Sequence, residues 1–307
     1  MYKAKGRLLG GAALALSLMV GSFIAAAPAS ATAPVSAPTS KSCDTGNVKK
    51  FIKCLSKPKP VKKAKASTAA PESNVTQSNY SYTVEEYLDY IVADVDTTWS
   101  KWFKATGFEE PYTGIIKIEP EDPAFMSLCN LTVNSDTPNA FYCDRDSVTD
   151  ANGVVYQGAL ILPVVAFQKM WTGDVLDRQS SITGDFAAAY IVAHEYGHSV
   201  QDEINIQSKA QGYALPAFTG ANKELIADCF AGVWMTSAYY SKLMEEGDIE
   251  EAIAAAEAIA DPVGVVVENP HGTANQRKNA VLIGYLGTSG GKFKAGDPLG
   301  CVASYWK

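Results

Sequence analysis

Hydrophobic and polar positions divide the chain into three parts. Residues 8–27 form a nearly continuous apolar run, residues 32–79 are rich in Ala, Ser, Thr, Pro and Lys, and residues 80–307 are long enough for one domain with its own core. Between residues 84 and 103, apolar side chains recur every three or four positions, which predicts an amphipathic helix with a buried stripe. The stripe consists of Tyr87, Tyr90, Ile91, Val95, Trp99, Trp102 and Phe103.

Further along, the pattern predicts two strands followed by four helices. Residues 115–118 and 154–162 are the predicted strands, and the segment from Cys129 to Cys143 between them contains Asn and Pro turn signals. The predicted helices cover residues 184–204, 222–244, 248–260 and 273–286. A few strands ahead of several helices indicate an α+β fold that is mostly helical with a small sheet.

Polar residues at the helix starts predict how three of these helices begin. A side-chain oxygen at the residue before a helix can accept a free backbone N–H, and Glu or Gln three positions later can complete a capping box. The sequence predicts Asn222 as an N-cap and the pairs Asp248/Glu251 and Thr273/Gln276 as capping boxes, with the last helix ending near Gly287.

The first 31 residues have the pattern of a signal peptide. Three cations, at Lys3, Lys5 and Arg7, precede the apolar run, and Ala29-Ser30-Ala31 is a small-residue cleavage signal. Cleavage near Ala31 would leave the protein secreted or associated with the cell envelope. The alternative is a retained anchor, because the run is about long enough to span a bilayer.

An even number of cysteines after a signal peptide predicts disulfide bonds. Proximity in sequence suggests two pairs and leaves the third by elimination. The predicted pairs are Cys43–Cys54, Cys129–Cys143 and Cys229–Cys301.

Charge is distributed unevenly along the chain. Residues 32–79 contain nine lysines against Asp44 and Glu72, whereas residues 80–307 have a formal charge of −17. The composition of residues 32–79 predicts a disordered, Pro-rich linker or tether, because it cannot bury enough apolar surface to offset its ordering entropy. Its basic part, residues 41–65, could contact an anionic cell envelope, and the acidic domain argues against a nucleic-acid partner.

The clearest chemical motif is His194-Glu195-Tyr196-Gly197-His198, which uses two of the three histidines in the chain. On a helix, residues four apart lie on one face, so both imidazoles can bind one metal ion. Glu195, which lies between them, is then the predicted general base for water activated by zinc.

A catalytic zinc site needs a third protein ligand, and two residues are candidates. His271 is the remaining histidine. Glu224 is favoured over it because Glu224 and Asp228 are four apart within an almost wholly apolar helix, where two unpaired carboxylates would be costly. Asp228 is then expected to accept the N–H of a ligand histidine.

If Glu224 is the ligand, His271 is free for another role. Its position in a loop before a helix suggests that it stabilises a developing oxyanion. Arg277 could do the same, although a structural ion pair with an acid is favoured. Cys43 could block the zinc as an inhibitory ligand, but a disulfide with Cys54 is favoured.

Four segments together resemble the neutral zinc metallopeptidase family of bacteria. The resemblance extends in order over residues 80–307 and implies a zincin-like domain in which His194, His198 and Glu224 bind zinc and Glu195 is catalytic. The segments are Gly184–Ala187, Val192–Gln201, Glu224–Trp234 and His271–Arg277.

The sequence therefore predicts a signal peptide (1–31), a linker (32–79) and a zinc metallopeptidase domain (80–307). The expected substrate is a protein or peptide, bound along an edge strand near Val154–Leu162. One alternative is a zinc amide hydrolase acting on cell-wall crosslinks, and another is a non-catalytic metal-binding envelope module. The sequence does not indicate an oligomeric state.

Overall fold

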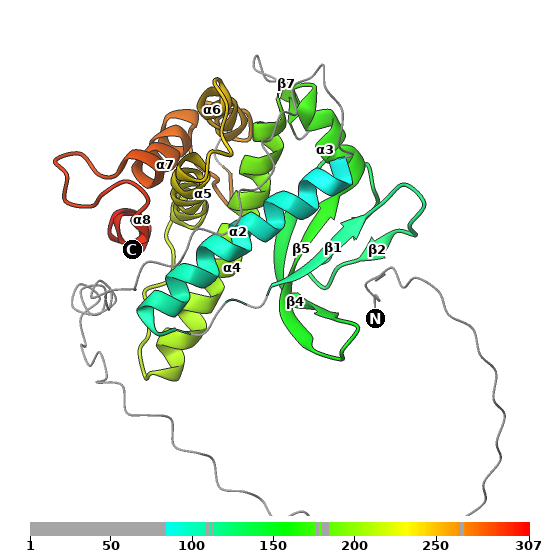
Figure 1. Cartoon of the computed structure of the whole chain (residues 1–307), viewed down its shortest axis with the longest axis horizontal. Coiled ribbons are helices and arrows are strands. Elements are labelled where there is room, and N and C mark those ends of the chain that lie inside the picture. The colour runs from blue at the N-terminus through cyan, green and yellow to red at the C-terminus, as the bar shows by residue number, and fades with distance from the viewer. Residues whose placement is uncertain (1–83, 109–110, 112, 176–177, 180–183, 265–266) are drawn as a thin grey trace, which may run out of the picture.

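A computed structural model describes residues 84–307 except 109–110, 112, 176–177, 180–183 and 265–266. The fold is α+β and mostly helical, as expected, with a small sheet on one side of a group of helices (Figure 1). The helices are α2 (Val84–Thr106), α3 (Val164–Trp171), α4 (Asp185–Ala210), α5 (Asn222–Tyr240), α6 (Asp248–Ala258), α7 (Ala274–Leu286) and α8 (Pro298–Tyr305). The strands are β1 (Gly114–Ile118), β2 (Phe125–Met126), β3 (Thr132–Val133), β4 (Phe141–Thr149), β5 (Val155–Pro163), β6 (Asp174–Val175) and β7 (Arg178–Gln179).

The predicted signal peptide, the linker and the Cys43–Cys54 pair lie outside the described residues. Among the helices that the structure describes, none combines the length and the apolar character needed to span a bilayer.

The main sheet has the strand order β1-β5-β4, with β5 parallel to β1 and antiparallel to β4. Both predicted strands are present, but the expectation that Val154–Leu162 forms an edge strand is wrong. Residues 158–163 of β5 are buried without alternation, which is the pattern of a central strand covered on both faces. Strands β1 and β4 are the two edges of this sheet. The pattern does not predict β4, because Asp144, Arg145 and Asp146 interrupt its apolar positions.

Two disulfide bonds fix the periphery of the fold, and both pairings are as predicted. Cys129–Cys143 ties the β2–β3 hairpin to β4. Cys229–Cys301 joins α5 to α8 across 72 residues of sequence, so the C-terminal helix is held against the core.

The long helix α2 crosses α4 (Figure 1) and buries the predicted aromatic stripe. Tyr87, Ile91, Val95, Trp99 and Phe103 are buried, while Tyr90 and Trp102 are partly buried against the same core. Two polar contacts fix α2 on the helices that carry the chemical motifs. Tyr196 of α4 donates to Asp96 at 2.6 Å, and Trp234 of α5 donates to Asp94 at 2.8 Å.

Helices α5 and α7 approach one another closely at two glycines. A Cβ atom at Gly232 would lie 2.1 Å from the carbonyl oxygen of Val281, and one at Gly284 would lie 1.9 Å from that of Cys229. Only glycine therefore permits this backbone separation. The close packing brings the first turn of α7, which carries Arg277, against Asp228 of α5.

The structure confirms only one of the predicted caps. Thr273 and Gln276 form a reciprocal capping box on α7, which ends at Gly287. Asn222 is already helical, and its helix stops at Tyr240, before Lys242 adopts a left-handed φ of 58°.

The predicted Asp248/Glu251 box is wrong because a tertiary contact uses Glu251. Its carboxylate accepts the N–H of Phe186 at 3.0 Å, at the start of α4. The residue before α4 is Gly184, which has no side chain for a cap, and a Cβ atom there would collide with the Glu251 carboxylate. Glu251 therefore supplies the missing cap from another helix.

This contact gathers Asp185, Asp248 and Glu251 into a carboxylate cluster whose oxygens lie within 4.8 Å of one another. Burial and repulsion from Glu245 raise the pKa of Asp185 to about 6. Burial and repulsion from neighbouring carboxylates, Asp185 among them, raise the pKa values of Asp248 and Glu251 to about 7. The folded protein therefore holds protons that the unfolded chain, with ordinary carboxyl pKa values, releases.

The cluster predicts that stability is lost as the pH rises through about 6–7. Glu251→Gln keeps an oxygen for Phe186 but removes a charge, so it should raise the thermal midpoint at pH 8 and change it little at pH 5. The expected gain is on the order of 1 kcal/mol, or about 2–4 °C for a domain of this size. Thermal melts of both proteins at the two pH values test this, with the exposed Glu257→Gln as the matched control. An equal effect of Glu251→Gln at both pH values would contradict it.

Candidate metal centre

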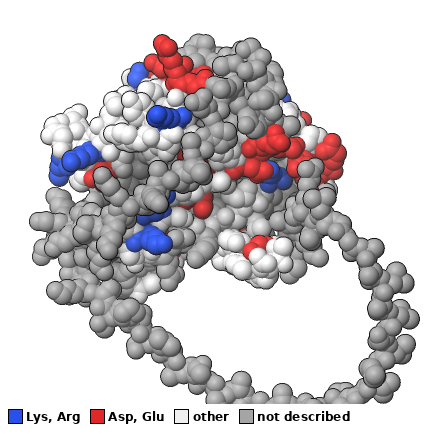
Figure 2. Space-filling model, viewed as in Figure 1, with Lys and Arg blue, Asp and Glu red and all other residues white. Residues whose placement is uncertain are grey.

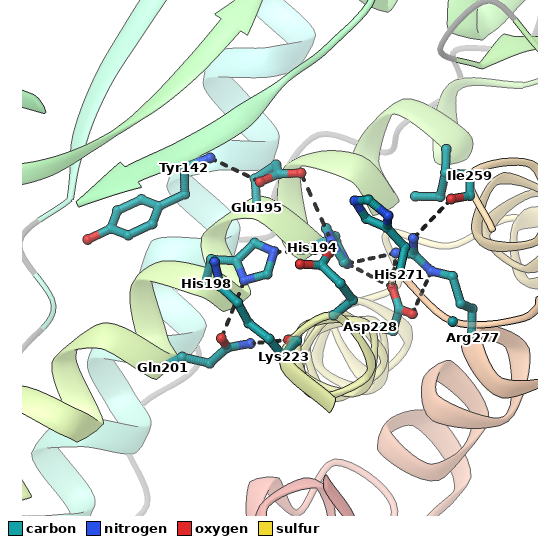
Figure 3. A network of polar contacts seen from close by, with 12 residues as sticks. Tyr142, His194, Glu195, His198, Gln201, Lys223, Asp228, Ile259, His271 and Arg277 are labelled. Carbon is teal, nitrogen blue, oxygen red and sulfur yellow. Dashed lines mark hydrogen bonds and ion pairs between the residues drawn. The ribbon is translucent and has the colours of Figure 1, made fainter. Parts of the chain in front are cut away.

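Three side chains from two helices bring ligand atoms within 4.8 Å of one another, and Figure 3 labels the two histidines among them. His194 and His198 project from α4, and Glu224 projects from the first turn of α5. Glu224 Oε2 lies 3.3 Å from His194 Nε2 and 3.4 Å from His198 Nε2. Zinc bonds of about 2.0–2.1 Å in a tetrahedron place neighbouring ligand atoms about 3.3–3.4 Å apart. The donor set therefore fits a zinc ion by both geometry and ligand type.

The environment of Glu224 favours its ionised, metal-binding form. Burial acts to raise the pKa of this carboxyl, but the charge of His198 and hydrogen bonds from both histidines lower it below its ordinary value. Helices α4 and α5 pack closely enough for Glu224 to reach both histidines. A Cβ atom at Gly197 of α4 would lie only 3.1 Å from the carbonyl oxygen of Ala227 in α5.

Asp228 lies one helical turn beyond Glu224 and supports His194 from behind. Its Oδ1 atom lies 2.7 Å from His194 Nδ1, so the Nε2 atom of the ring is directed to the metal position. Burial alone would lower the pKa of His194, whereas Asp228 raises it to about 9. Zinc binding must therefore displace a proton, and zinc affinity should fall as the pH falls.

A fully buried network holds Asp228 itself. Arg277, which is only 1% exposed, donates from Nε to Oδ2 at 2.8 Å and from Nη2 to Oδ1 at 2.7 Å. Tyr190 also donates to Oδ1. The ion pair expected for Arg277 is confirmed, and it compensates the buried charge of Asp228.

Gln201 supports the second histidine. Its Oε1 atom lies 3.3 Å from His198 Nδ1, and its Nε2 atom donates to the carbonyl of Lys223 at 2.9 Å. Sequence reasoning gave neither Gln201 nor Tyr190 a role. Their helical spacing was a usable signal, because Gln201 is three residues after His198 and Tyr190 is four before His194.

Glu195 lies at the mouth of the site and is anchored by the edge strand. The N–H of Tyr142 in β4 donates to Glu195 Oε2 at 3.0 Å, while Oε1 lies 4.0 Å from His194 Nε2. Tyr142 is held in turn by Asp202, which accepts its hydroxyl at 3.1 Å, and its ring lies over Gly158, where a Cβ atom would collide with it. One Glu195 oxygen is thus fixed and the other faces the metal position.

His271 is not part of the group of three donors. Its side chain is 54% exposed and lines the same cleft of about 350 Å³, with Nδ1 lying 3.3 Å from Asp261 Oδ1. Of the two candidates for a third ligand, Glu224 therefore belongs to the group of donor atoms, whereas His271 lines the cleft outside that group.

The site is of the zinc metallohydrolase class. It combines two histidines on one helix, a glutamate between them and a carboxylate from the next helix. The chain belongs to the family described as "Putative neutral zinc metallopeptidase", whose model matches residues 52–297.

Two further proteins are similar in sequence to this chain. "Uncharacterized protein YpfJ" of Escherichia coli (strain K12) is 30% identical over 236 residues, which cover 70% of each chain. "Uncharacterized protein Rv2575" of Mycobacterium tuberculosis (strain ATCC 25618 / H37Rv) is 36% identical over 137 residues, which cover 38% of this chain and 44% of the relative. No solved structure matches the chain.

Proposed function

We propose that this protein is an exported, zinc-dependent metallopeptidase that hydrolyses peptide bonds, with His194, His198 and Glu224 as ligands and Glu195 as general base. The observation that carries the proposal is the pair of distances, 3.3 and 3.4 Å, between Glu224 and the two histidines. The anchored carboxylate of Glu195 adds a base, which a site that only stored metal would not need.

A zinc ion held by His194, His198 and Glu224 would supply Lewis acidity, which would make water more acidic and polarise a carbonyl group. Glu195 accepts a proton from the attacking water through Oε1 and delivers it to the leaving amine. Tyr142 keeps the other oxygen of Glu195 in place, so the base does not have to reorient between the two transfers. His271 donates to the oxygen that becomes negative during attack.

The edge strand β4 offers a place for an extended substrate. In an antiparallel pair, residues alternate between bonding their partner strand and pointing away from it. The N–H of Tyr142 points to Glu195, so its carbonyl and the backbone groups of Ala140 face the cleft that both residues line. A peptide can add to this edge as a further strand, with its scissile bond above the metal position.

The proposed partner is a protein or peptide rather than a nucleic acid. Acidic side chains gather at the top and right of the molecular face in Figure 2, where they would repel phosphates. Residues 1–31 act as a cleaved leader in this proposed function, and residues 32–79 act as a basic linker. The Cys129–Cys143 and Cys229–Cys301 disulfides support an oxidising destination outside the cytosol.

Incubating the zinc-loaded protein with casein and, separately, with purified cell wall tests the proposal. Peptide-bond hydrolysis predicts new casein fragments that disappear with a chelator and return with zinc. Release of amino groups from the wall alone would instead favour the cell-wall amide hydrolase. Zinc binding without hydrolysis of either substrate would indicate a non-catalytic metal-binding module and contradict the proposal.

A further inference from the structure

The loop that carries His271 is attached to Asp261 by three contacts. The Asp261 N–H donates to the carbonyl of Gly272 at 2.9 Å, and Oδ2 of the same residue accepts the Gly272 N–H at 2.7 Å. The remaining oxygen, Oδ1, faces His271 Nδ1 at 3.3 Å. Asp261 is 13% exposed and His271 is 54% exposed, so a shielded carboxylate holds a histidine that reaches into the cleft.

The same loop is fixed against the helix that provides Glu224. Gly272 has a φ of +97°, and a Cβ atom there would lie 3.1 Å from Leu225 and 3.3 Å from Ala221, at the start of α5. The left-handed conformation therefore favours glycine, and the neighbouring side chains leave little room for a larger residue. The position of His271 relative to the metal ligands is consequently set by packing.

Arg277 contacts both the backbone just before Asp261 and the carboxylate of Asp228. Its Nη1 atom donates to the carbonyl of Ile259 at 3.3 Å, two residues before Asp261, while the rest of its guanidinium holds Asp228. One buried guanidinium, that of Arg277, thus contacts both the Ile259–Asp261 segment and Asp228. Asp261 has a defined position, although none of its contacts is to a metal ligand.

We propose that Asp261 is a positioning residue that orients the His271 imidazole, with Nδ1 toward the carboxylate and the opposite nitrogen toward the cleft. With Nδ1 held by a carboxylate, the opposite nitrogen is left for the cleft. A carboxylate in this arrangement fixes the orientation of the ring, and a ring that carries hydrogen on both nitrogens can then donate into the cleft. The inference rests on the proposed function, since it assigns Asp261 to the same reaction.

Asp261→Asn separates orientation of the histidine from support of the loop. The amide oxygen can still accept the Gly272 N–H, and the Asp261 backbone contact with Gly272 is unchanged. The Thr273/Gln276 capping box holds the following helix independently. The group facing His271 becomes an amide NH2, so the negative charge and the acceptor opposite Nδ1 are lost together. Glu257→Gln on α6 is the matched control, because it removes the same charge from an exposed pair with Lys278.

The experiment measures kcat and KM on fluorescein-labelled casein for the zinc-loaded wild type, Asp261→Asn, His271→Gln, the double variant and Glu257→Gln. Loss of an oxyanion donor typically costs about 10²–10³-fold in kcat, and loss of a group that orients it about 10–100-fold. We expect Asp261→Asn to lower kcat within the smaller range, with KM, zinc content and thermal midpoint unchanged. The double variant should be no slower than His271→Gln alone.

Several results would overturn the inference while leaving the proposed function intact. They are an unchanged kcat for Asp261→Asn, a double variant whose loss is the product of the two single losses, and loss of zinc or a lowered thermal midpoint in Asp261→Asn. Absence of casein cleavage by the wild type would overturn the proposed function and this inference together.

Discussion

Glu195→Gln is expected to abolish casein cleavage while the protein keeps its zinc. Glutamine has nearly the same shape, and its carbonyl oxygen can still accept the Tyr142 N–H, so the local structure should persist. It cannot take a proton from water, and general-base catalysis contributes about 10²–10⁴-fold. We therefore expect kcat to fall by at least that range, measured together with zinc content by elemental analysis.

Glu203→Gln is the matched control, because Glu203 lies on the same helix two turns beyond the site and accepts from Gln207 at 2.5 Å. It should cleave casein at the wild-type rate. Unchanged turnover in Glu195→Gln would rule out Glu195 as the base. Loss of zinc in this variant would show that the residue acts through the metal rather than on water.

Glu224→Ala is expected to lose zinc on dialysis, whereas His271→Ala is expected to keep it. Removing the carboxylate leaves two histidines, one ligand fewer than a catalytic zinc site requires. It also removes the partner that lies 3.3 and 3.4 Å from the two imidazoles. His271 lines the cleft but is outside the group of donor atoms, so its loss should slow cleavage without changing zinc content.

Thermal melts with and without added zinc give a second readout, because a ligand that binds only the folded state raises the midpoint. Zinc should raise it for the wild type and for His271→Ala, and leave it unchanged for Glu224→Ala. The reverse pattern would make His271 the third ligand.

The two pairs of residues at the metal centre could be predicted from local sequence, because helical periodicity places the members of each pair on one face of a helix. The spacing of four puts His194 and His198 on one face, and it does the same for Glu224 and Asp228. The capping box at Thr273 is also local, and it is present. Each of these predictions depends on residues within one turn of each other.

What the sequence could not supply depends on contacts between distant elements. Glu251 caps α4 rather than its own helix, and Tyr142 reaches Glu195 from a strand whose charged residues hid it. Asp261 was not singled out because only folding brings it beside His271. The order of strands in the sheet is likewise not encoded by any single segment, so the central strand β5 was taken for an edge.

The central claim is zinc-dependent peptide hydrolysis at the His194–His198–Glu224 centre. Cleavage-site profiling of a defined peptide library by the wild type, at a measured zinc content of about one ion per chain, tests it most directly. The account predicts cuts at internal peptide bonds that vanish on chelation and return in proportion to the zinc restored. A fully zinc-loaded protein that cuts no peptide, or cuts that persist without zinc, would contradict it.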